Sequence, residues 1–447
     1  MRILSGAPAL PTLTGASPLS PSLPGIRTEA AAGPVESFQA TDAQRADALE
    51  ARRDNAAVRE GVRSLGPAGS VASAEQQVAR QGATARKVLG PLEPRTEMGK
   101  VDPGTLILSD FFDERTGPSH GAIVENSSRD VGFSNKIQLN EAPTNKANEA
   151  TSKYFSRLDN KQFSPEELRE FTRDYVVNRQ SGNLQSATDE LNGLTEAGVK
   201  GTALNLSRGS GKAQIMDDLY ERLRLGWDST AHPQSMQVGE RRVRKLAPAL
   251  GVDAEAVLAD KGDARAQLQK NLLGLIDEGT ADEKVVRARQ SYGKAVGDFE
   301  ANGNSVVVAA ANSGKVLRTM ERDAKGVEVA PDFFKNVLAN DQVTTVGATR
   351  NLGGSASIAD YTNADPGIDV YANGTYDGSE GTSFATPRVA SVMAELHRQH
   401  PNASSAEVEA MMKEKLTGSL GDYGGWTKAP VLDETAARKF FSGAAAQ

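Results

Sequence analysis

The residues most able to do chemistry in this 447-residue chain lie in the run Gly381–Pro387, which reads Gly-Thr-Ser-Phe-Ala-Thr-Pro. A glycine-rich loop leads here into a helix-forming stretch, so we expect Ser383 at a helix N-terminus. Unpaired main-chain N–H groups and the positive end of the helix dipole point at that position, and both stabilise a developing oxyanion. The proline is expected to fall within the first turn, where no donor is lost. Taken alone, the serine is equally compatible with a turn or a helix cap.

Three further residues supply what a nucleophilic serine needs, and they precede it in the chain. Asp110 ends an apolar run, His120 follows ten residues later at an expected helix start, and Asn312 ends a run of valines and alanines. Acyl transfer requires a base for the serine proton, a carboxylate that orients the base, and a donor for the oxyanion. Each residue by itself has a structural explanation, as a helix cap, a surface histidine or a turn former. Their shared position at strand ends and helix starts favours a hydrolytic site.

The elements that position these residues are expected to form an α/β domain. Short apolar runs that read as buried parallel strands lie at 105–109, 203–207, 305–311 and 343–348. Helices are predicted from a capping box at 164–167, over about 187–197, and over about 285–300. Strand and helix in alternation favour a mostly parallel central sheet flanked by helices, with functional groups at the carboxyl ends of the strands. A charged helical stretch at about 225–282 is interpreted as an insertion.

Composition excludes several classes of function. The net charge of −7 provides no basic field for nucleic acid, which we do not expect as a partner. The chain has no Cys and four His, so a disulfide framework, a thiolate site and a multi-histidine metal site are not expected. No apolar stretch is long enough to span a membrane.

The first 100 residues are interpreted as a low-complexity and partly helical extension. Their Ser- and Pro-rich start does not resemble a classical signal peptide, so we expect a cytoplasmic protein or export by an effector-type route. The sequence therefore predicts an extension at 1–100, one domain at 101–436 and a tail at 437–447.

Residues from about 101 to 435 resemble the subtilases, the subtilisin-like serine proteases. Gly381–Pro387 matches the Gly-Thr-Ser-x-Ala-x-Pro pattern of the family in full. Val306–Gly314 is similar to its oxyanion strand, and Ala203–Gly209 to its substrate-pairing strand. Tyr423–Gly425 also has a counterpart. The resemblance implies a three-layer subtilisin-like fold and a serine endopeptidase that acts on proteins or peptides, without a required cofactor.

The resemblance also assigns roles to the candidate residues. Ser383 would be the nucleophile, His120 the base and then the acid, Asp110 the carboxylate that orients it, and Asn312 the oxyanion donor. The substrate would pair with Ser207, Arg208 and Gly209, and Ala310 and Ala311 would line the first specificity pocket. We expect Arg208 to favour an acidic residue about four places before the cut, unless this side chain is simply solvated. Calcium, which many subtilases bind, is left open, and a monomer is expected.

The chain departs from the family pattern around the histidine. The interval from Asp110 to His120 is short, which makes Asp113 an alternative carboxylate, and Glu125 replaces a small residue. Arg388 stands where a histidine is common. An alternative hypothesis is therefore a catalytically impaired subtilase scaffold that acts as a binding or effector module.

Overall fold

The computed structural model describes residues 101–110, 112, 119–132, 136–141, 146–259, 262–352, 355–363, 367–419 and 430–443. The predictions made for residues 1–100, Asp113 and Tyr423–Gly425 lie outside the described residues.

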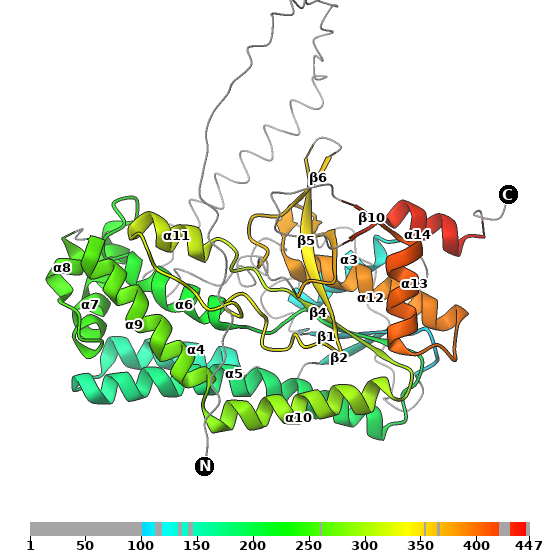
Figure 1. The fold of residues 1–447 in the computed structure, drawn as a ribbon, viewed down its shortest axis with the longest axis horizontal. Helices are drawn as coiled ribbons and strands as arrows, with labels where there is room; N and C mark the ends of the chain where they lie inside the picture. Colours follow the sequence, from blue (N-terminus) through cyan, green and yellow to red (C-terminus); the bar gives the residue numbers. More distant parts are fainter. Residues whose placement is uncertain are drawn as a thin grey trace, which may run out of the picture. The chain divides into compact units, whose positions relative to one another are not determined.

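A mostly parallel sheet forms the centre of the described part (Figure 1). Its strands run in the order β10-β11-β7-β5-β4-β3-β1-β2, with β6 paired to β5. The pairs β10–β11 and β5–β6 are antiparallel and the others are parallel. The strands, together with the separate β8–β9 pair, are β1 (Leu106–Asp110), β2 (Ile137–Glu141), β3 (Ala203–Leu206), β4 (Ser305–Ala309), β5 (Thr344–Leu352), β6 (Ser355–Ile358), β7 (Val370–Asn373), β8 (Thr375–Tyr376), β9 (Ser379–Glu380), β10 (Thr417–Gly418) and β11 (Val431–Leu432).

Helices cover both faces of this sheet. They are α3 (His120–Arg129), α4 (Lys146–Asn160), α5 (Pro165–Glu196), α6 (Lys212–Arg224), α7 (Pro233–Ala249), α8 (Ala254–Leu258), α9 (Gly262–Thr280), α10 (Glu283–Glu300), α11 (Val316–Asp323), α12 (Thr382–Gln399), α13 (Ser405–Lys415) and α14 (Glu434–Phe441).

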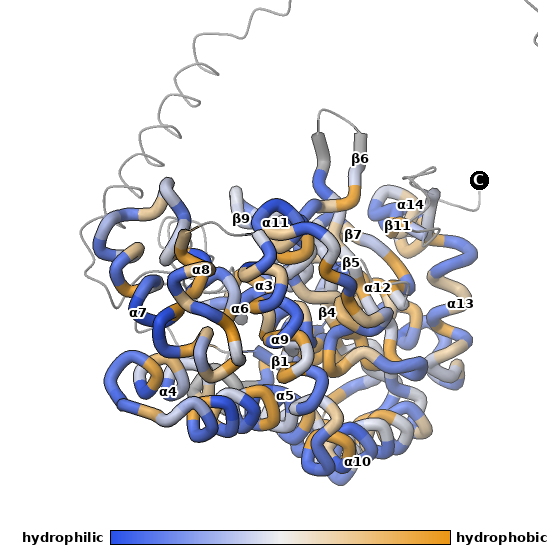
Figure 2. Tube along the Cα trace, turned by 60° about the vertical axis from the view of Figure 1, so that its left-hand side comes forward, coloured by the Kyte–Doolittle hydropathy of each residue, from blue (hydrophilic) through white to orange (hydrophobic). Residues whose placement is uncertain are grey.

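Alternate side chains of the strands point to opposite helical layers, as the two-residue period of a strand requires. Val307 of β4 packs in one core with residues of α12, whereas Val306 and Val308 pack in another with residues of α5 and α10. Because both faces are buried, the strands read as continuous apolar runs. Figure 2 shows these apolar residues gathered on the strands and on α12, with hydrophilic residues on outlying helices such as α7.

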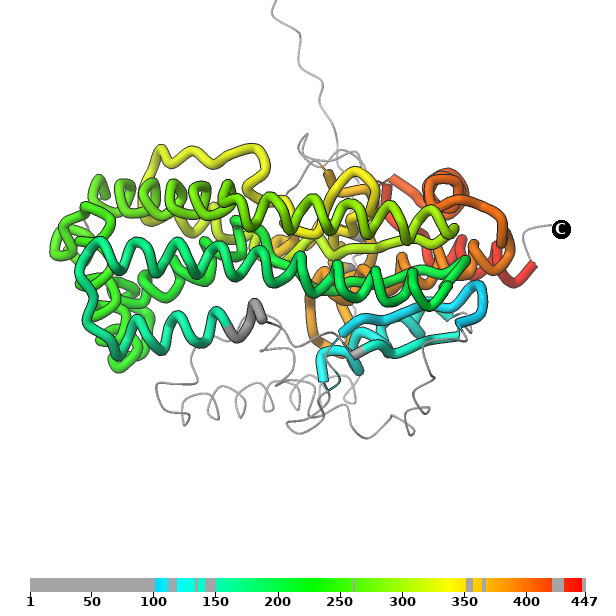
Figure 3. Tube along the Cα trace, turned by 90° about the horizontal axis from the view of Figure 1, so that it is seen from below, coloured from blue at the N-terminus to red at the C-terminus, as the bar shows by residue number. Residues whose placement is uncertain are grey.

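The predicted insertion at 225–282 is helical and belongs to a larger helical lobe. Residues of α7, α8 and α9 share one core with α4, α6, α11 and the first half of α5. Figure 3 shows α5 lying between α4 and α10, both of which it contacts. The lobe and the sheet are thus connected by one long helix, α5.

The structure corrects three details of the predicted elements. The helices predicted at the capping box and at about 187–197 are one 32-residue helix, and the capping box at Ser164 and Glu167 is formed. Edge strand β2 was not predicted. The tail proposed from residue 437 begins inside α14, so the boundary at 436 is wrong.

Candidate active site

Asp110 and His120 meet at the carboxyl end of β1. Asp110 is the last residue of the strand, and His120 is the first residue of α3, whose N-cap Ser119 accepts a hydrogen bond from the Ala122 N–H. The histidine Nδ1 lies 2.8 and 2.9 Å from the two carboxylate oxygens of Asp110. The carboxyl side chain is 3% exposed and the imidazole 12%. A buried carboxylate on Nδ1 orients the ring and selects the tautomer whose basic nitrogen is Nε2.

Ser383 lies in the first turn of α12, as predicted, and is nearly buried. The imidazole of His120 lies close to the start of this helix, with its centroid 6.3 Å from the ring centroid of Phe384. Among the described residues, the Ser383 hydroxyl donates to the Ser207 carbonyl oxygen at 3.3 Å and not to His120. A proton transfer from Ser383 to His120 would require the hydroxyl to leave the Ser207 carbonyl. Such contacts often tighten only when substrate is bound.

Pro387 has a different role from the one predicted. It lies beyond the first turn of α12, at a position where a residue normally donates its N–H to the carbonyl four residues earlier. Because proline has no N–H, the carbonyl of Ser383 lacks this helical hydrogen bond. That carbonyl instead accepts a hydrogen bond from the Ser207 hydroxyl at 2.9 Å. The Ser383 carbonyl, left without a helical donor, thus connects the first turn of α12 to the segment after β3.

The side-chain amide of Asn312 is fixed by Thr382. Its Oδ1 accepts from both the main-chain N–H and the hydroxyl of Thr382, each at 2.9 Å. A main-chain N–H can only donate, so this bond identifies the oxygen and leaves Nδ2 as a donor beside the start of α12. The N-cap residue Gly381 supplies no side-chain cap. Asn312 therefore caps α12 with its Oδ1 atom and presents a hydrogen-bond donor with its Nδ2 atom.

The two alanines before Asn312, expected to line the first specificity pocket, have different surroundings. Ala310 is 1% exposed and belongs to a core cluster with Ile368 and Tyr371, so its side chain faces the protein interior. Ala311 is 7% exposed and has a φ of 80°, in the left-handed region that disfavours a residue with a Cβ. A residue from another segment stabilises this turn, because Asn363 donates its N–H to the Ala311 carbonyl at 3.1 Å.

The segment predicted to pair with substrate follows β3 and retains open main-chain groups. Asn336 donates to the carbonyls of Arg208 and Ala309, at 3.2 and 2.6 Å, and so joins this segment to β4. Gly209 has a φ of 109°, and a Cβ there would lie 2.4 Å from Asn336 Oδ1, so only glycine fits. Within the described residues, no main-chain hydrogen bond engages the N–H or C=O of Gly209. An extended peptide can add to such a free edge through its own main chain.

The Arg208 side chain is neither solvated nor open to substrate. Its guanidinium donates to Glu190 Oε2 at 2.5 Å and to Ser186 Oγ at 3.3 Å, both on α5. The arginine side chain is 10% exposed and the glutamate side chain 1%. Since Glu190 already neutralises this charge, the structure opposes the expected preference for an acidic substrate residue.

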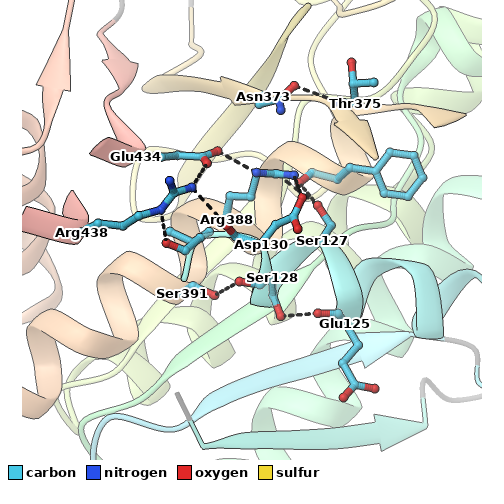
Figure 4. A network of polar contacts seen from close by, with 12 residues as sticks. Glu125, Ser127, Ser128, Asp130, Asn373, Thr375, Arg388, Ser391, Glu434 and Arg438 are labelled. Carbon is cyan, nitrogen blue, oxygen red and sulfur yellow. Dashed lines mark hydrogen bonds and ion pairs between the residues drawn. The ribbon is translucent and has the colours of Figure 1, made fainter. Parts of the chain in front are cut away.

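Arg388 forms the centre of a buried network between the helices that carry His120 and Ser383 (Figure 4). Its side chain is 2% exposed and pairs with Asp130, at the end of α3, and with Glu434 of α14, at 2.9 and 2.8 Å. Its Nε donates to Ser127 Oγ at 3.2 Å, and that hydroxyl donates to the carbonyl of Phe384 at 2.8 Å. The arginine thus links α3, α12 and α14 through one planar group.

Sequence reasoning missed three buried polar residues that support the site, namely Asn336, Asn363 and Glu190. Each contacts residues more than 20 positions away or on another element, so no local pattern marks it. In the part of the chain that the structure describes, no three acidic, His or Cys side chains gather as a metal site. None of the described helices is long and apolar enough to cross a membrane.

Comparison with known proteins supports a relationship over the second part of the chain. A model of the subtilase family matches residues 185–435, which include Ser207–Gly209, Asn312 and Ser383 but not Asp110 and His120. M-protease of Shouchella clausii is 32% identical over 152 residues, which cover 32% of this chain and 36% of that protein. Subtilisin DY of Bacillus licheniformis is 30% identical over 149 residues, covering 32% of this chain and 51% of that protein.

Two solved protease structures resemble this chain over most of its length. A lanthipeptide protease is 13% identical and covers 76% of this chain and 89% of its own, with a TM-score of 0.38. A cold-adapted subtilisin-like serine proteinase is 15% identical and covers 81% and 98%, with a TM-score of 0.33. The subtilase family model spans more than half of the chain. The chain belongs to the subtilase family.

Proposed function

We propose that this chain is a serine endopeptidase with Asp110, His120 and Ser383 as its catalytic triad. The observation that carries the proposal is the contact of Asp110 with His120 beside the helix whose first turn holds Ser383. A base oriented by a buried carboxylate next to a helix-start serine is the arrangement that acyl transfer requires.

The reaction follows from these groups. Ser383 Oγ attacks the scissile carbonyl while His120 Nε2 takes the hydroxyl proton, and Asp110 stabilises the imidazolium that forms. The oxyanion of the tetrahedral intermediate accepts hydrogen bonds from Asn312 Nδ2 and from the main-chain N–H of Ser383, which has no helical acceptor in the first turn. His120 then protonates the leaving amine, and a water molecule hydrolyses the acyl-enzyme by the same steps.

The substrate is proposed to bind as an extended peptide beside residues 207–209. Its main chain would use the unengaged N–H and C=O of Gly209 and displace the Ser383 hydroxyl from the Ser207 carbonyl. Because the substrate would be bound through its main chain, and because the Arg208 charge is already paired with Glu190, we expect the enzyme to accept many different substrate side chains upstream of the cut.

Labelling with a fluorophosphonate probe, combined with hydrolysis of a peptide p-nitroanilide, tests the proposal. Wild-type protein should label and hydrolyse, and Ser383→Ala and His120→Ala should do neither above a residual rate. Ser391→Ala is the matched control, because it removes another buried hydroxyl from α12, one that donates to the Ser128 carbonyl. Absence of labelling in folded wild-type protein would reject the enzyme and favour a non-catalytic scaffold.

A further inference from the structure

Glu190 is a buried carboxylate at the junction of the helical lobe and the candidate active site. It lies on α5, in the half of the helix that packs under the sheet, and its side chain is 1% exposed. A buried glutamate is rare unless its oxygens are hydrogen-bonded and its charge is paired. Glu190 meets both conditions through three different elements.

The three partners of Glu190 all lie near the residues proposed to act on substrate. Oε2 accepts from the Ser109 hydroxyl at 2.6 Å and from the Arg208 guanidinium at 2.5 Å, and Oε1 accepts from the amide of Asn140 at 2.6 Å. Ser109 directly precedes Asp110 on β1, and Asn140 of β2 lies opposite Ser109 in the sheet. One carboxylate therefore joins the strand end that holds Asp110 to the segment proposed to hold substrate.

Arg208 depends on Glu190 for its position. Its Nε is buried without a hydrogen-bond partner, and the hydroxyl of Tyr292 is likewise unpartnered among the described residues. Burial raises the pKa of Tyr292, so this residue offers no anion in exchange. Glu190 is thus the counter-charge that keeps the Arg208 side chain against α5, while Asn336 donates a hydrogen bond to the main-chain carbonyl of Arg208.

We propose that Glu190 is a positioning residue for substrate binding: through Arg208 it holds the main chain of residues 207–209 in the conformation to which an extended peptide adds. The inference rests on the proposed peptidase function and deepens it. It predicts that loss of Glu190 weakens the use of upstream substrate residues more than it weakens the chemistry at Ser383, because binding energy from the remote part of a substrate is collected along this segment.

The test compares a tetrapeptide p-nitroanilide with a single-residue ester. The measured quantities are kcat/KM of the tetrapeptide divided by kcat/KM of the ester, and the KM of the tetrapeptide. In Glu190→Gln the ratio should fall about tenfold relative to wild type, mainly through a higher KM, as expected when a binding contact is lost. Asp218→Asn is the matched control, because it breaks another largely buried ion pair of α5, between Arg179 of that helix and Asp218 of α6, and should leave the ratio unchanged.

A double variant separates positioning from stability. Glu190→Leu combined with Arg208→Leu leaves no unpaired buried charge, so its thermal unfolding should recover towards wild type. The ratio should nevertheless stay low, because the segment has lost its anchor. A ratio that recovers with stability, or that never falls in Glu190→Gln, overturns the inference and leaves the peptidase intact. Wild-type protein that hydrolyses neither substrate rejects the proposed function itself.

Discussion

Replacing Asn312 tests the cap that the structure shows for its amide and the oxyanion role that we propose for it. In Asn312→Ala the donor Nδ2 is removed from the proposed oxyanion position, and the acceptor Oδ1 is removed from Thr382. In Asn312→Asp the donor is removed but two oxygens remain to accept from Thr382. The pair of variants therefore separates catalysis from folding at a single position.

The magnitudes follow from the contacts. Thr382 is fully buried, and Gly381 offers no other side-chain cap. Loss of the bond to its N–H should cost about 1 kcal/mol, as for other helix caps. Loss of the bond to its hydroxyl should cost about 1 kcal/mol more. Asn312→Ala should thus lower the free energy of unfolding by about 2 kcal/mol, whereas Asn312→Asp should lower it far less.

Both variants should lose turnover to a similar extent. Removal of one oxyanion donor lowers kcat by about 100- to 1000-fold, or about 2.7–4 kcal/mol of barrier. This range is the one measured for the oxyanion-hole amide of a subtilisin. The aspartate also places a negative charge where the oxyanion forms, so its kcat should be at least as low as that of the alanine variant.

The assay combines kcat for a peptide p-nitroanilide with urea unfolding of the same samples. The expected result is two variants with similarly low kcat but different free energies of unfolding. The reasoning is refuted if Asn312→Ala keeps more than a tenth of wild-type kcat. It is also refuted if both variants lose the same stability, since Oδ1 would then not be the cap of α12.

Three further predictions concern stability. Ala311→Gly should raise the free energy of unfolding by up to about 1 kcal/mol in urea titrations, because it relieves a positive φ that costs more than the added freedom of glycine. Arg388→Met should lower it by about 2–4 kcal/mol, because two carboxylates lose a buried partner, and an unchanged midpoint would count against the network in Figure 4. Burial lowers the pKa of His397 to about 4, so the folded state favours the neutral imidazole. The contribution of the neutral ring to the free energy of unfolding is complete above the unfolded pKa of about 6.5, and it is lost as pH falls from 6.5 through 4. His397→Gln, which can keep a bond to Ser305, should make the pH dependence of unfolding flatter by up to about 3 kcal/mol over this interval.

Much of the fold was predictable because its signals are local. Short apolar runs buried on both faces predicted β3 and β4, and the Ser164 capping box predicted the start of α5. The length of α5 was not predicted, because polar residues in its middle, such as Gln180 and Asn183, are buried by partners on other elements. A local pattern cannot report such partners.

The candidate site was likewise predictable from the sequence only in part. Residue types and chain order indicated Asp110, His120, Asn312 and Ser383, because acyl transfer needs these groups and strand ends and helix starts present them. Arg208 was misjudged, since a charged residue in a loop is usually solvated and its partner Glu190 is 18 residues earlier in the chain.

The sequence by itself thus indicated the family through a contiguous motif and the parallel α/β architecture through local periodicity, and it supplied the candidate reacting groups. Only the tertiary structure decided which atom of Asn312 caps α12, which carbonyl replaces the bond lost at Pro387, and which carboxylate neutralises Arg208. These outcomes are set by hydrogen bonds and charge pairs between elements far apart in the chain. Burial makes such bonds obligatory, but only the packing of helices and strands selects the partner.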